Sequence, residues 1–209
     1  MLIHCLRQAD SSALAIPDDE DNILCVIRRW PCKTKSRTRE RILGAASAAL
    51  ISRGPEQPSV NEIMGAAGLT VGGFYAHFDS KEALMLEAFE QLLSQRRASV
   101  AQLDEQLPAE ERRALVAAFY LSRKHRDATA EACPLPSTIG DMARMQGSFQ
   151  AALESHLELM VAQLSGSPEE ADKVLADFAL MVGGLALSRA LGASDLSDRV
   201  LRAAKSAVI

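Results

Sequence analysis

The chain has 209 residues, a formal net charge of −4 and only 4% aromatic residues. This length suits a small domain joined to a larger one, and an Ala- and Leu-rich composition with few aromatics is typical of helical bundles. No apolar run approaches the roughly 20 residues needed to span a bilayer, and residues 1–16 lack a signal-peptide pattern, so we expect a cytoplasmic protein with no membrane partner.

Residues 1–32 form an extension that we expect to be disordered, because it is poorly patterned and contains an acidic cluster at residues 18–21. The cysteines of the whole chain have neither a CxxC pair nor the spacing of a zinc site; they are Cys5, Cys25, Cys32 and Cys133. The sequence therefore predicts no disulfide scaffold, no metal site and no cofactor.

Basic residues gather at the first predicted helix, which we expect to run from Ser36 to Arg53. Residues 33–53 carry six cations against one anion, a net charge of +5, although the whole chain is acidic. A local excess of this kind favours the phosphates of DNA. The alternative interpretation is that these basic side chains are simply solvated at the start of a helix, and both interpretations stay open at this point.

Two short helical patterns, separated by a turn, occupy residues 59–81. Ser59 and Glu62 have the spacing of a capping box, which would start the first pattern. Gly68 suits the left-handed backbone with which a chain turns sharply after a short helix. This layout is typical of a helix-turn-helix, and it predicts a DNA-binding domain over residues 33–80.

The second pattern would be the recognition helix. Thr70 is its cap candidate, and Phe74 and Phe78 stand four residues apart on the face that we expect to be buried. Gly72 and Gly73 lie on the opposite face, although a glycine inside a helix costs roughly 1 kcal/mol relative to Ala. Close approach of the backbone to a DNA duplex would explain them.

Over residues 39–86 the chain resembles the TetR/AcrR family of transcriptional repressors. The residues that carry the resemblance are Arg39, Ile42-Leu43-x-Ala45-Ala46, Gly54, Ser59-Val60-x-x-Ile63, Ala67-Gly68, Gly73-Phe74-Tyr75-x-His77-Phe78 and Lys81-Glu82-x-Leu84. The resemblance implies an all-α fold in which the helix-turn-helix domain continues into a helical ligand-binding and dimerisation domain over residues 81–209. It also implies a repressor that is not an enzyme and that an effector releases from a pseudo-palindromic operator.

The candidate DNA contacts fall into three groups. The amino end of the recognition helix would face base edges, through Thr70, Val71, Gly72 and Gly73. By resemblance to the family, four further residues would contact phosphates: Ser59, Tyr75, His77 and Lys81. An arm that reaches the minor groove could consist of Lys33, Lys35 and Arg37, although basic tails are commonly just solvated.

The rest of the chain reads as helices, with no strand pattern. We expect helices over residues 81–103, 109–122, 148–164, 168–191 and 196–208, and a short helical segment that ends near residue 144. Residues 123–136 should be irregular. Ser167, followed by Pro168 and by a glutamate that could complete a capping box, predicts a strong helix start.

The last two predicted helices are the candidate dimer interface. The helix over residues 168–191 is apolar almost all round after Val174, so it should be buried on every side. Small residues at 183–184 would allow another helix to approach closely. A four-helix interface between two copies would bury these faces and set two recognition helices about 34–36 Å apart. The alternative is that both helices belong to the core of a monomer.

A small, mostly apolar effector could bind between the helices of the second domain. The candidate contacts, which are equally plausible as plain core, are Phe119, Tyr120, Cys133, Met142, Phe149, Leu153 and Phe178. Release would require that the effector bind the state that is not on DNA more tightly. The helix that follows the recognition helix would be the mechanical link.

Cys133 is the one chemically suggestive residue. Basic residues at 123–126 would lower the pKa of its thiol and make the thiol more nucleophilic. Some family members with a similar Gly-Cys-Pro-Leu segment respond to electrophiles or oxidants, and this chain has Ala132 in place of the Gly. The alternatives are an inert buried cysteine or, from another functional class, a helical thiol-dependent redox enzyme centred on Cys133.

Overall fold

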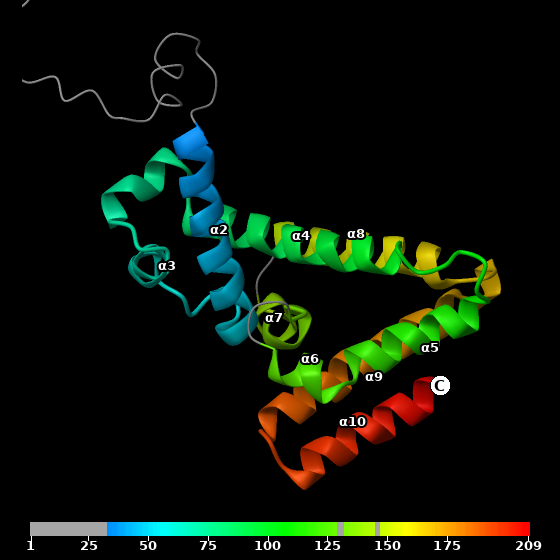
Figure 1. Cartoon of the computed structure of the whole chain (residues 1–209). Helices are drawn as coiled ribbons and strands as arrows, with labels where there is room; N and C mark the ends of the chain where they lie inside the picture. The colour runs from blue at the N-terminus through cyan, green and yellow to red at the C-terminus, as the bar shows by residue number, and fades with distance from the viewer. Residues whose placement is uncertain (1–32, 129–131, 145–146) are drawn as a thin grey trace, which may run out of the picture. The chain divides into compact units, whose positions relative to one another are not determined.

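The computed structural model describes residues 33–128, 132–144 and 147–209, so the predicted disordered extension lies outside the described residues. The chain divides into two compact units, residues 1–39 and residues 40–209. Helix α2 (Lys33–Arg53) includes residues of both units, and every later element belongs to the second one (Figure 1). Every regular element in the described ranges is a helix, which confirms the predicted all-α fold.

The helix-turn-helix consists of α2, α3 (Val60–Ala66) and the 3₁₀ helix η1 (Val71–Ala76). Its core contains Ile42 of α2 and Phe74 of η1, both fully buried, together with Phe78, which is 5% exposed. The rings of Phe74 and Phe78 lie with their centroids 5.9 Å apart. The prediction that these two aromatic residues anchor the recognition segment is therefore confirmed.

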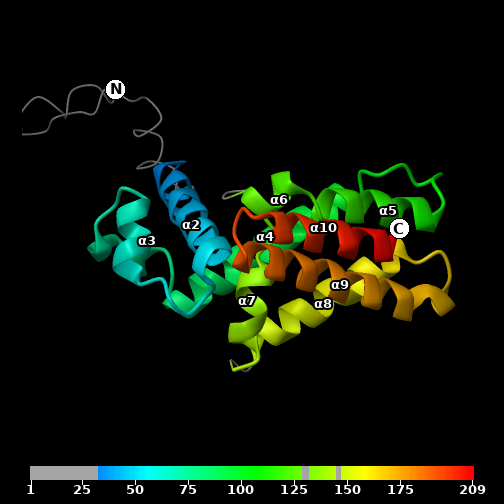
Figure 2. The same cartoon turned by 90° about the horizontal axis from the view of Figure 1, so that it is seen from below.

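The remaining helices form the body. They are α4 (Lys81–Val100), α5 (Ala109–Tyr120), α6 (Arg123–Asp127), α7 (Leu135–Met142), α8 (Ser148–Leu164), η2 (Pro168–Glu170), α9 (Ala171–Ala190) and α10 (Asp195–Val208). Helices α9 and α10 lie side by side, as do α4 and α8 (Figures 1 and 2). None of the described helices is both long and apolar enough to cross a membrane.

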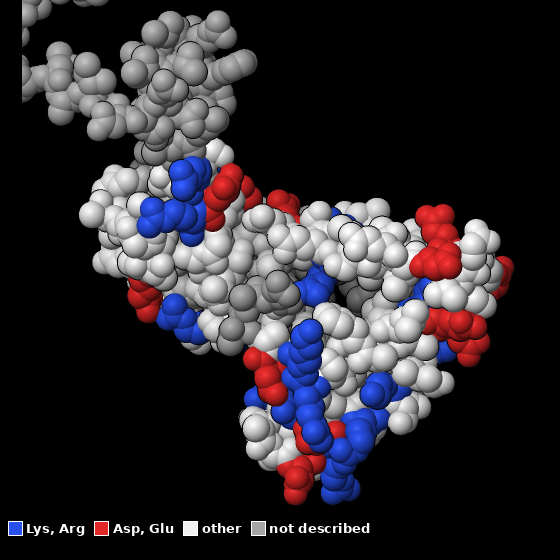
Figure 3. Space-filling model, in the orientation of Figure 1, with Lys and Arg blue, Asp and Glu red and all other residues white. Residues whose placement is uncertain are grey.

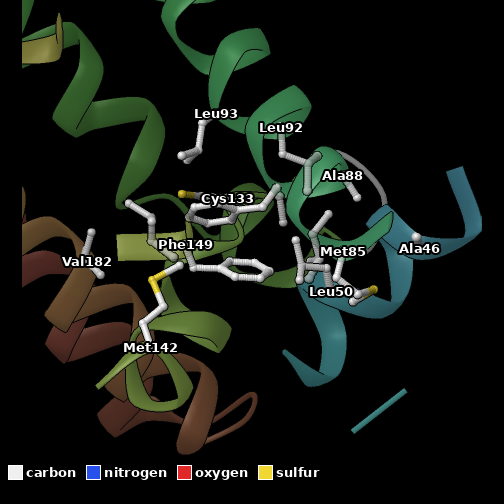
Figure 4. Close-up of a cluster of buried hydrophobic side chains, with 14 of the residues drawn as sticks. Ala46, Leu50, Met85, Ala88, Leu92, Leu93, Cys133, Met142, Phe149 and Val182 are labelled. Carbon is white, nitrogen blue, oxygen red and sulfur yellow. The ribbon is translucent and has the colours of Figure 1, made fainter. Parts of the chain in front are cut away.

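The hydrophobic core continues from the helix-turn-helix into the body. Figure 4 shows Ala46 and Leu50 of α2 beside Met85 and Ala88 of α4, in the same cluster as Phe149 of α8. The rings of Phe149 and Phe89 lie 5.5 Å apart. The first half of α4 therefore packs against both parts of the protein.

The recognition segment is a 3₁₀ helix, where the sequence predicted an α-helix. Its bonds connect residues three apart, such as the N–H of Gly73 to the carbonyl of Thr70 at 3.3 Å. Six residues with two adjacent glycines have little propensity to extend an α-helix, so the shorter turn is favoured. The predicted cap is also wrong, because the side chain of Thr70 makes no capping bond.

Two other predictions about helix boundaries were wrong. The expected irregular stretch 123–136 contains two helical segments in its described part, because Ser122 caps α6 by accepting the N–H of His125, and α7 begins at Leu135. Prolines are tolerated in the first turn of a helix, so Pro136 does not prevent α7. The expected capping box at Ser167 is absent, because the carboxylate of Glu170 instead accepts bonds from Arg113 and from the N–H of Gly166.

Candidate DNA interface and effector cavity

Helix α3 of the helix-turn-helix begins with a capping box, as the sequence predicted. The hydroxyl of Ser59 accepts the N–H of Glu62 at 3.2 Å, and the carboxylate of Glu62 accepts the N–H of Ser59 at 2.8 Å. Arg53 of α2 also donates to this carboxylate, at 2.8 Å. These bonds, above all the backbone N–H of Ser59, lower the pKa of Glu62 to about 2. The start of α3 is thus tied to the end of α2.

The turn between α3 and η1 is fixed by a contact with Arg41 of α2. Gly68 adopts a left-handed φ of +66°, as its place in the sequence predicted. Arg41 donates from Nη2 to the carbonyl of Ala67 at 2.6 Å, and a Cβ on Gly68 would lie 2.9 Å from the same Nη2. Any larger residue at this position would therefore meet both backbone strain and the guanidinium group.

The recognition segment presents an exposed surface. The side chain of Val71 is 39% exposed and that of Tyr75 is 73% exposed; Thr70 is exposed as well. A Cβ added to Gly72 or Gly73 would meet no atom within 4 Å, so packing inside the protein gives no reason for either glycine. The four residues predicted to face base edges all lie on this exposed surface.

The four predicted phosphate contacts have different environments. Ser59 is exposed and takes part in the capping box, and Lys81 donates from Nζ to the carbonyl of Glu56 at 2.7 Å. His77 is half-buried, and its Nδ1 is shielded from solvent without a hydrogen-bond partner among the described residues. Tyr75 is 73% exposed, so its hydroxyl is accessible to a phosphate.

The basic charge of α2 is partly engaged within the protein. Arg41 and Arg53 make the contacts described above, whereas Lys35 and Arg37 are exposed in the N-terminal part of α2. Lys33 begins the helix. Figure 3 shows basic and acidic side chains next to each other on this surface. The net charge of the segment therefore overstates the charge that is available to a partner.

A cavity of about 350 Å³ lies in the body, and residues of α4, α5, α8 and α9 and the segment from Cys133 to Leu135 form its wall. Figure 3 shows a hollow between the surfaces over α4 and α5. Most of the wall is apolar. A volume of this size is at the small end of the range for ligand pockets.

The cavity brings together four of the seven predicted effector contacts: Phe119, Tyr120, Cys133 and Phe178. The other three do not line it. Met142 and Phe149 are buried in the core, and Leu153 is half-buried against the core. Arg96 of α4 and His156 and Met160 of α8 line the cavity, and the sequence interpretation missed them. Nothing in the linear sequence marks them, since they reach the cavity through the packing of α4 against α8.

Cys133 is a buried free thiol, only 2% exposed. Its backbone N–H donates to Nε2 of His125 at 3.0 Å, and Nδ1 of His125 is 2.9 Å from the carbonyl of Tyr120, which fixes one neutral tautomer. Burial raises the pKa of the Cys133 thiol, although Arg96 and Arg189 oppose the rise. The expectation that nearby cations lower this pKa was therefore wrong in its net direction.

The basic residues just before Cys133 serve other partners. Arg126 lies 2.7 Å from a carboxylate oxygen of Asp127 and 2.8 Å from one of Asp198, and Arg123 lies 2.7 Å from Asp198. Asp127 and Asp198 thus offset much of the positive charge that the sequence placed beside the thiol. A buried, protonated thiol is a poor nucleophile. This environment argues against the redox-enzyme alternative.

The helix-turn-helix matches a known family. Residues 42–88 match the model of the family described as "Bacterial regulatory proteins, tetR family". A curated relative, the uncharacterized HTH-type transcriptional regulator YerO of Bacillus subtilis, is 25% identical over 152 residues, or 70% of this chain; the match spans about half of that relative (53%). These matches support a TetR-family transcriptional regulator.

Solved structures of other proteins share the fold along most of the chain. A TetR transcriptional regulator from Chloroflexus aurantiacus is 22% identical, with a TM-score of 0.72, and the match covers 84% of this chain and 94% of that one. The reduced form of Escherichia coli NemR has a TM-score of 0.69 at 18% identity and coverage of 82% and 95%. A Legionella pneumophila regulator has a TM-score of 0.69 at 20% identity and coverage of 82% and 95%.

The family match assigns a general role to the helix-turn-helix. DNA binding follows from the matched family, whose model covers α3 and η1 and parts of α2 and α4. Proteins of this family are generally regulators and not enzymes.

Proposed function

We propose that this TetR-family regulator is a homodimeric repressor that binds a pseudo-palindromic operator and is released when a small effector occupies the cavity. Binding to chromosomal DNA would place it in the cytoplasm. We infer ligand binding and not electrophile capture as the trigger, because the thiol of Cys133 is buried and its pKa is raised.

The proposal depends on one observation: helix α4 follows the recognition segment at one end and lines the cavity near its other end. Helix α4 begins at Lys81, five residues after the recognition segment ends at Ala76. Near its other end, Arg96, Ser99 and Val100 line the cavity. A ligand that displaces this part of α4 would tilt the helix and move the recognition segment. A shift of this kind follows only if the ligand prefers the displaced state.

Helix α7 provides a second connection between the cavity and the helix-turn-helix. Cys133 and Leu135, at its start, line the cavity. Farther along, α7 lies against the end of α2, where a Cβ on Gly54 would be 2.7 Å from the carbonyl oxygen of Ser137 and 2.6 Å from Oδ2 of Asp141. A close-packed joint of this kind transmits a displacement and does not absorb it.

The proposed dimer interface rests on the exposed faces of α9 and α10. Leu187 is 60% exposed and Leu180 is 36% exposed, on a helix that is apolar almost all round after Val174. Gly184 packs against Ala204 of α10 within the protomer, whereas Gly183 is exposed. The groove between the two helices is mostly apolar, and residues of both helices line it. A second copy of the same pair would bury these side chains and form a four-helix interface.

A binding experiment on DNA tests the repressor function. Fluorescence anisotropy with duplexes from upstream of the protein's own gene should show one operator that binds more tightly than a scrambled duplex, with affinity that falls steeply as salt rises. Tyr75→Phe should weaken binding several-fold, because it removes only the exposed hydroxyl, while Ser94→Ala, an exposed change on α4, should not. Equal affinity for operator and scrambled duplexes at every salt concentration would overturn the proposal.

A further inference from the structure

His156 of α8 is a buried polar residue in the wall of the cavity, 3% exposed. Its Nδ1 lies 2.9 Å from Nη1 of Arg97 in α4. A guanidinium group has donors and no acceptor, so Nδ1 accepts this bond and carries no proton. The loss of solvation, followed by the charge of Arg97, lowers the pKa of His156 to about 4, and the ring is therefore neutral at pH 7. The single ring proton is on Nε2.

The N–H of Nε2 is a donor directed at the cavity. The two ring nitrogens of histidine point in nearly opposite directions, and Nδ1 faces Arg97, which does not line the cavity. Nothing in the described part of the chain accepts a hydrogen bond from Nε2. A buried donor without a partner is costly, because it has lost the water that would satisfy it. This N–H therefore indicates a ligand that supplies an acceptor.

The other neutral polar groups of the described wall are less suited to hold a ligand. The hydroxyl of Ser99 already donates to the carbonyl of Gln95 at 3.0 Å. The hydroxyl of Tyr120 is shielded from solvent, and the thiol of Cys133, itself a weak donor, lies beside it. Among these groups, Nε2 of His156 is the donor that a molecule in the cavity can reach.

The rest of the wall restricts the ligand to a mostly apolar molecule. Val116, Phe119, Met160 and Phe178 line it, and its described residues include no Asp or Glu that could hold a cation. One neutral N–H does not compensate the burial of a carboxylate, whereas it suits the single oxygen of a carbonyl group. Arg96 also lines the wall, with its guanidinium carbon 5.9 Å from the centroid of the Phe119 ring, so the test below includes an anion.

We propose that the effector class is an uncharged, mostly apolar carbonyl compound, such as a ketone or an ester. Its oxygen accepts a hydrogen bond from Nε2 of His156, and its hydrocarbon part lies against Val116, Met160 and Phe178. The regulatory effect of this ligand rests on the proposed function. Binding itself can be tested without DNA.

Ligand-observed NMR titration with three probes of similar size provides the test: acetophenone, ethylbenzene and benzoate, with propiophenone and propylbenzene as a longer pair. A ketone is hydrated more strongly than the matching hydrocarbon, so a cavity without a donor would prefer the hydrocarbon. We expect each ketone to bind at least as tightly as its hydrocarbon partner, and benzoate to bind least.

His156→Asn removes the donor and keeps the bond to Arg97, because Oδ1 of Asn can take the place of Nδ1 as acceptor. Ketone binding should weaken roughly fivefold or more. Ethylbenzene should bind as before, which would show that the cavity is intact. The matched control is Ser155→Asn, which places the same side chain on an exposed position of α8 outside the cavity wall and should change nothing.

The ¹⁵N shifts of the His156 ring give a readout in the unmodified protein, whether or not the variant folds. The free protein should show the neutral ring with its proton on Nε2. Acetophenone should shift Nε2 and its proton more than Nδ1, and ethylbenzene should leave the Nε2 proton in place.

The proposal is overturned if neither ketone binds, if benzoate binds more tightly than the ketones, if His156→Asn keeps full affinity for them, or if the ring proton is on Nδ1. A ketone that binds should then release operator DNA from the unmodified protein. Binding without release would support the ligand class and contradict the proposed function.

Discussion

Ser137, near the start of α7, donates a hydrogen bond from its hydroxyl to the backbone carbonyl of Leu50 in α2, over 2.9 Å. The same hydroxyl is 2.8 Å from the carbonyl of Pro134. Leu50 is fully buried in the core of the helix-turn-helix. The start of α7, at Leu135, lines the cavity. One half-buried side chain therefore joins the proposed effector region to the helix-turn-helix.

Removal of this bond should loosen the joint without unfolding the protein. Ser137→Ala deletes one hydrogen bond and should lower the free energy of unfolding by roughly 1 kcal/mol. Hydrogen exchange of amides in residues 48–54 and 135–142 should become faster, since both sides of the joint lose a contact. Ser94→Ala, an exposed change on α4, is the control. Equal exchange in the two variants would mean that the bond does not couple α7 to α2.

The tight joint at Gly54 predicts opposite effects of two glycine substitutions. Gly54, just after the end of α2, has a φ of +77°, and an added Cβ would lie 2.6 Å from Oδ2 of Asp141, whereas an added Cβ on Gly44 within α2 would meet nothing within 4 Å. Gly54→Ala should therefore lower the free energy of unfolding by about 1–3 kcal/mol. Gly44→Ala should raise it by up to about 1 kcal/mol. Urea denaturation measures both, and equal effects would contradict this account.

A charge on the exposed face of α9 should prevent dimer formation. Leu187 is 60% exposed, so Leu187→Glu should leave the fold of the protomer intact but place a carboxylate in the proposed interface. Size-exclusion chromatography with light scattering should show a monomer, and affinity for the operator should fall at least tenfold. Leu159→Glu, at a position on α8 that is 46% exposed, is the matched control and should stay dimeric. A dimeric Leu187→Glu protein would exclude this interface.

The two buried histidines predict how stability depends on pH. Burial lowers the pKa of His125 and of His156 from 6.5 to about 4, so below pH 6.5 the unfolded chain binds protons that the folded chain does not. The free energy of unfolding should be highest above pH 6.5 and fall toward pH 4, by at most roughly 3 kcal/mol for each histidine. In His156→Gln, whose amide oxygen can still accept from Arg97, the fall should be smaller. An unchanged slope would show that His156 is not neutral in the fold.

Cys133 should react slowly with alkylating reagents in the folded protein. Its thiol is buried and its pKa is raised, so both access and the thiolate fraction are low. Mass spectrometry of the peptide that contains Cys133, after timed exposure to iodoacetamide, should show much faster labelling in urea than in buffer. Cys133→Ser should still release DNA in response to the effector. Loss of that response would restore the electrophile-sensing hypothesis.

Local chemistry explains which features could be read from the sequence. The bonds between Ser59 and Glu62 connect residues three apart, and the left-handed turn at Gly68 depends on one residue, so both were predictable. The cavity was not, because Arg96 and His156 lie sixty residues apart and meet only when α4 packs on α8. The environment of Cys133 was misread for the same reason: Asp198, which is remote in sequence, binds the arginines that precede it.

The open space around Gly72 and Gly73 has a consequence for the evolution of the protein. Neither glycine has a positive φ, and a side chain at either position would contact nothing in the protein itself. New residues can therefore arise there without harm to folding. Under the proposed function, a single substitution at either position would change the operator and leave the body unaltered, so a descendant could acquire a new operator and still answer the same chemical signal.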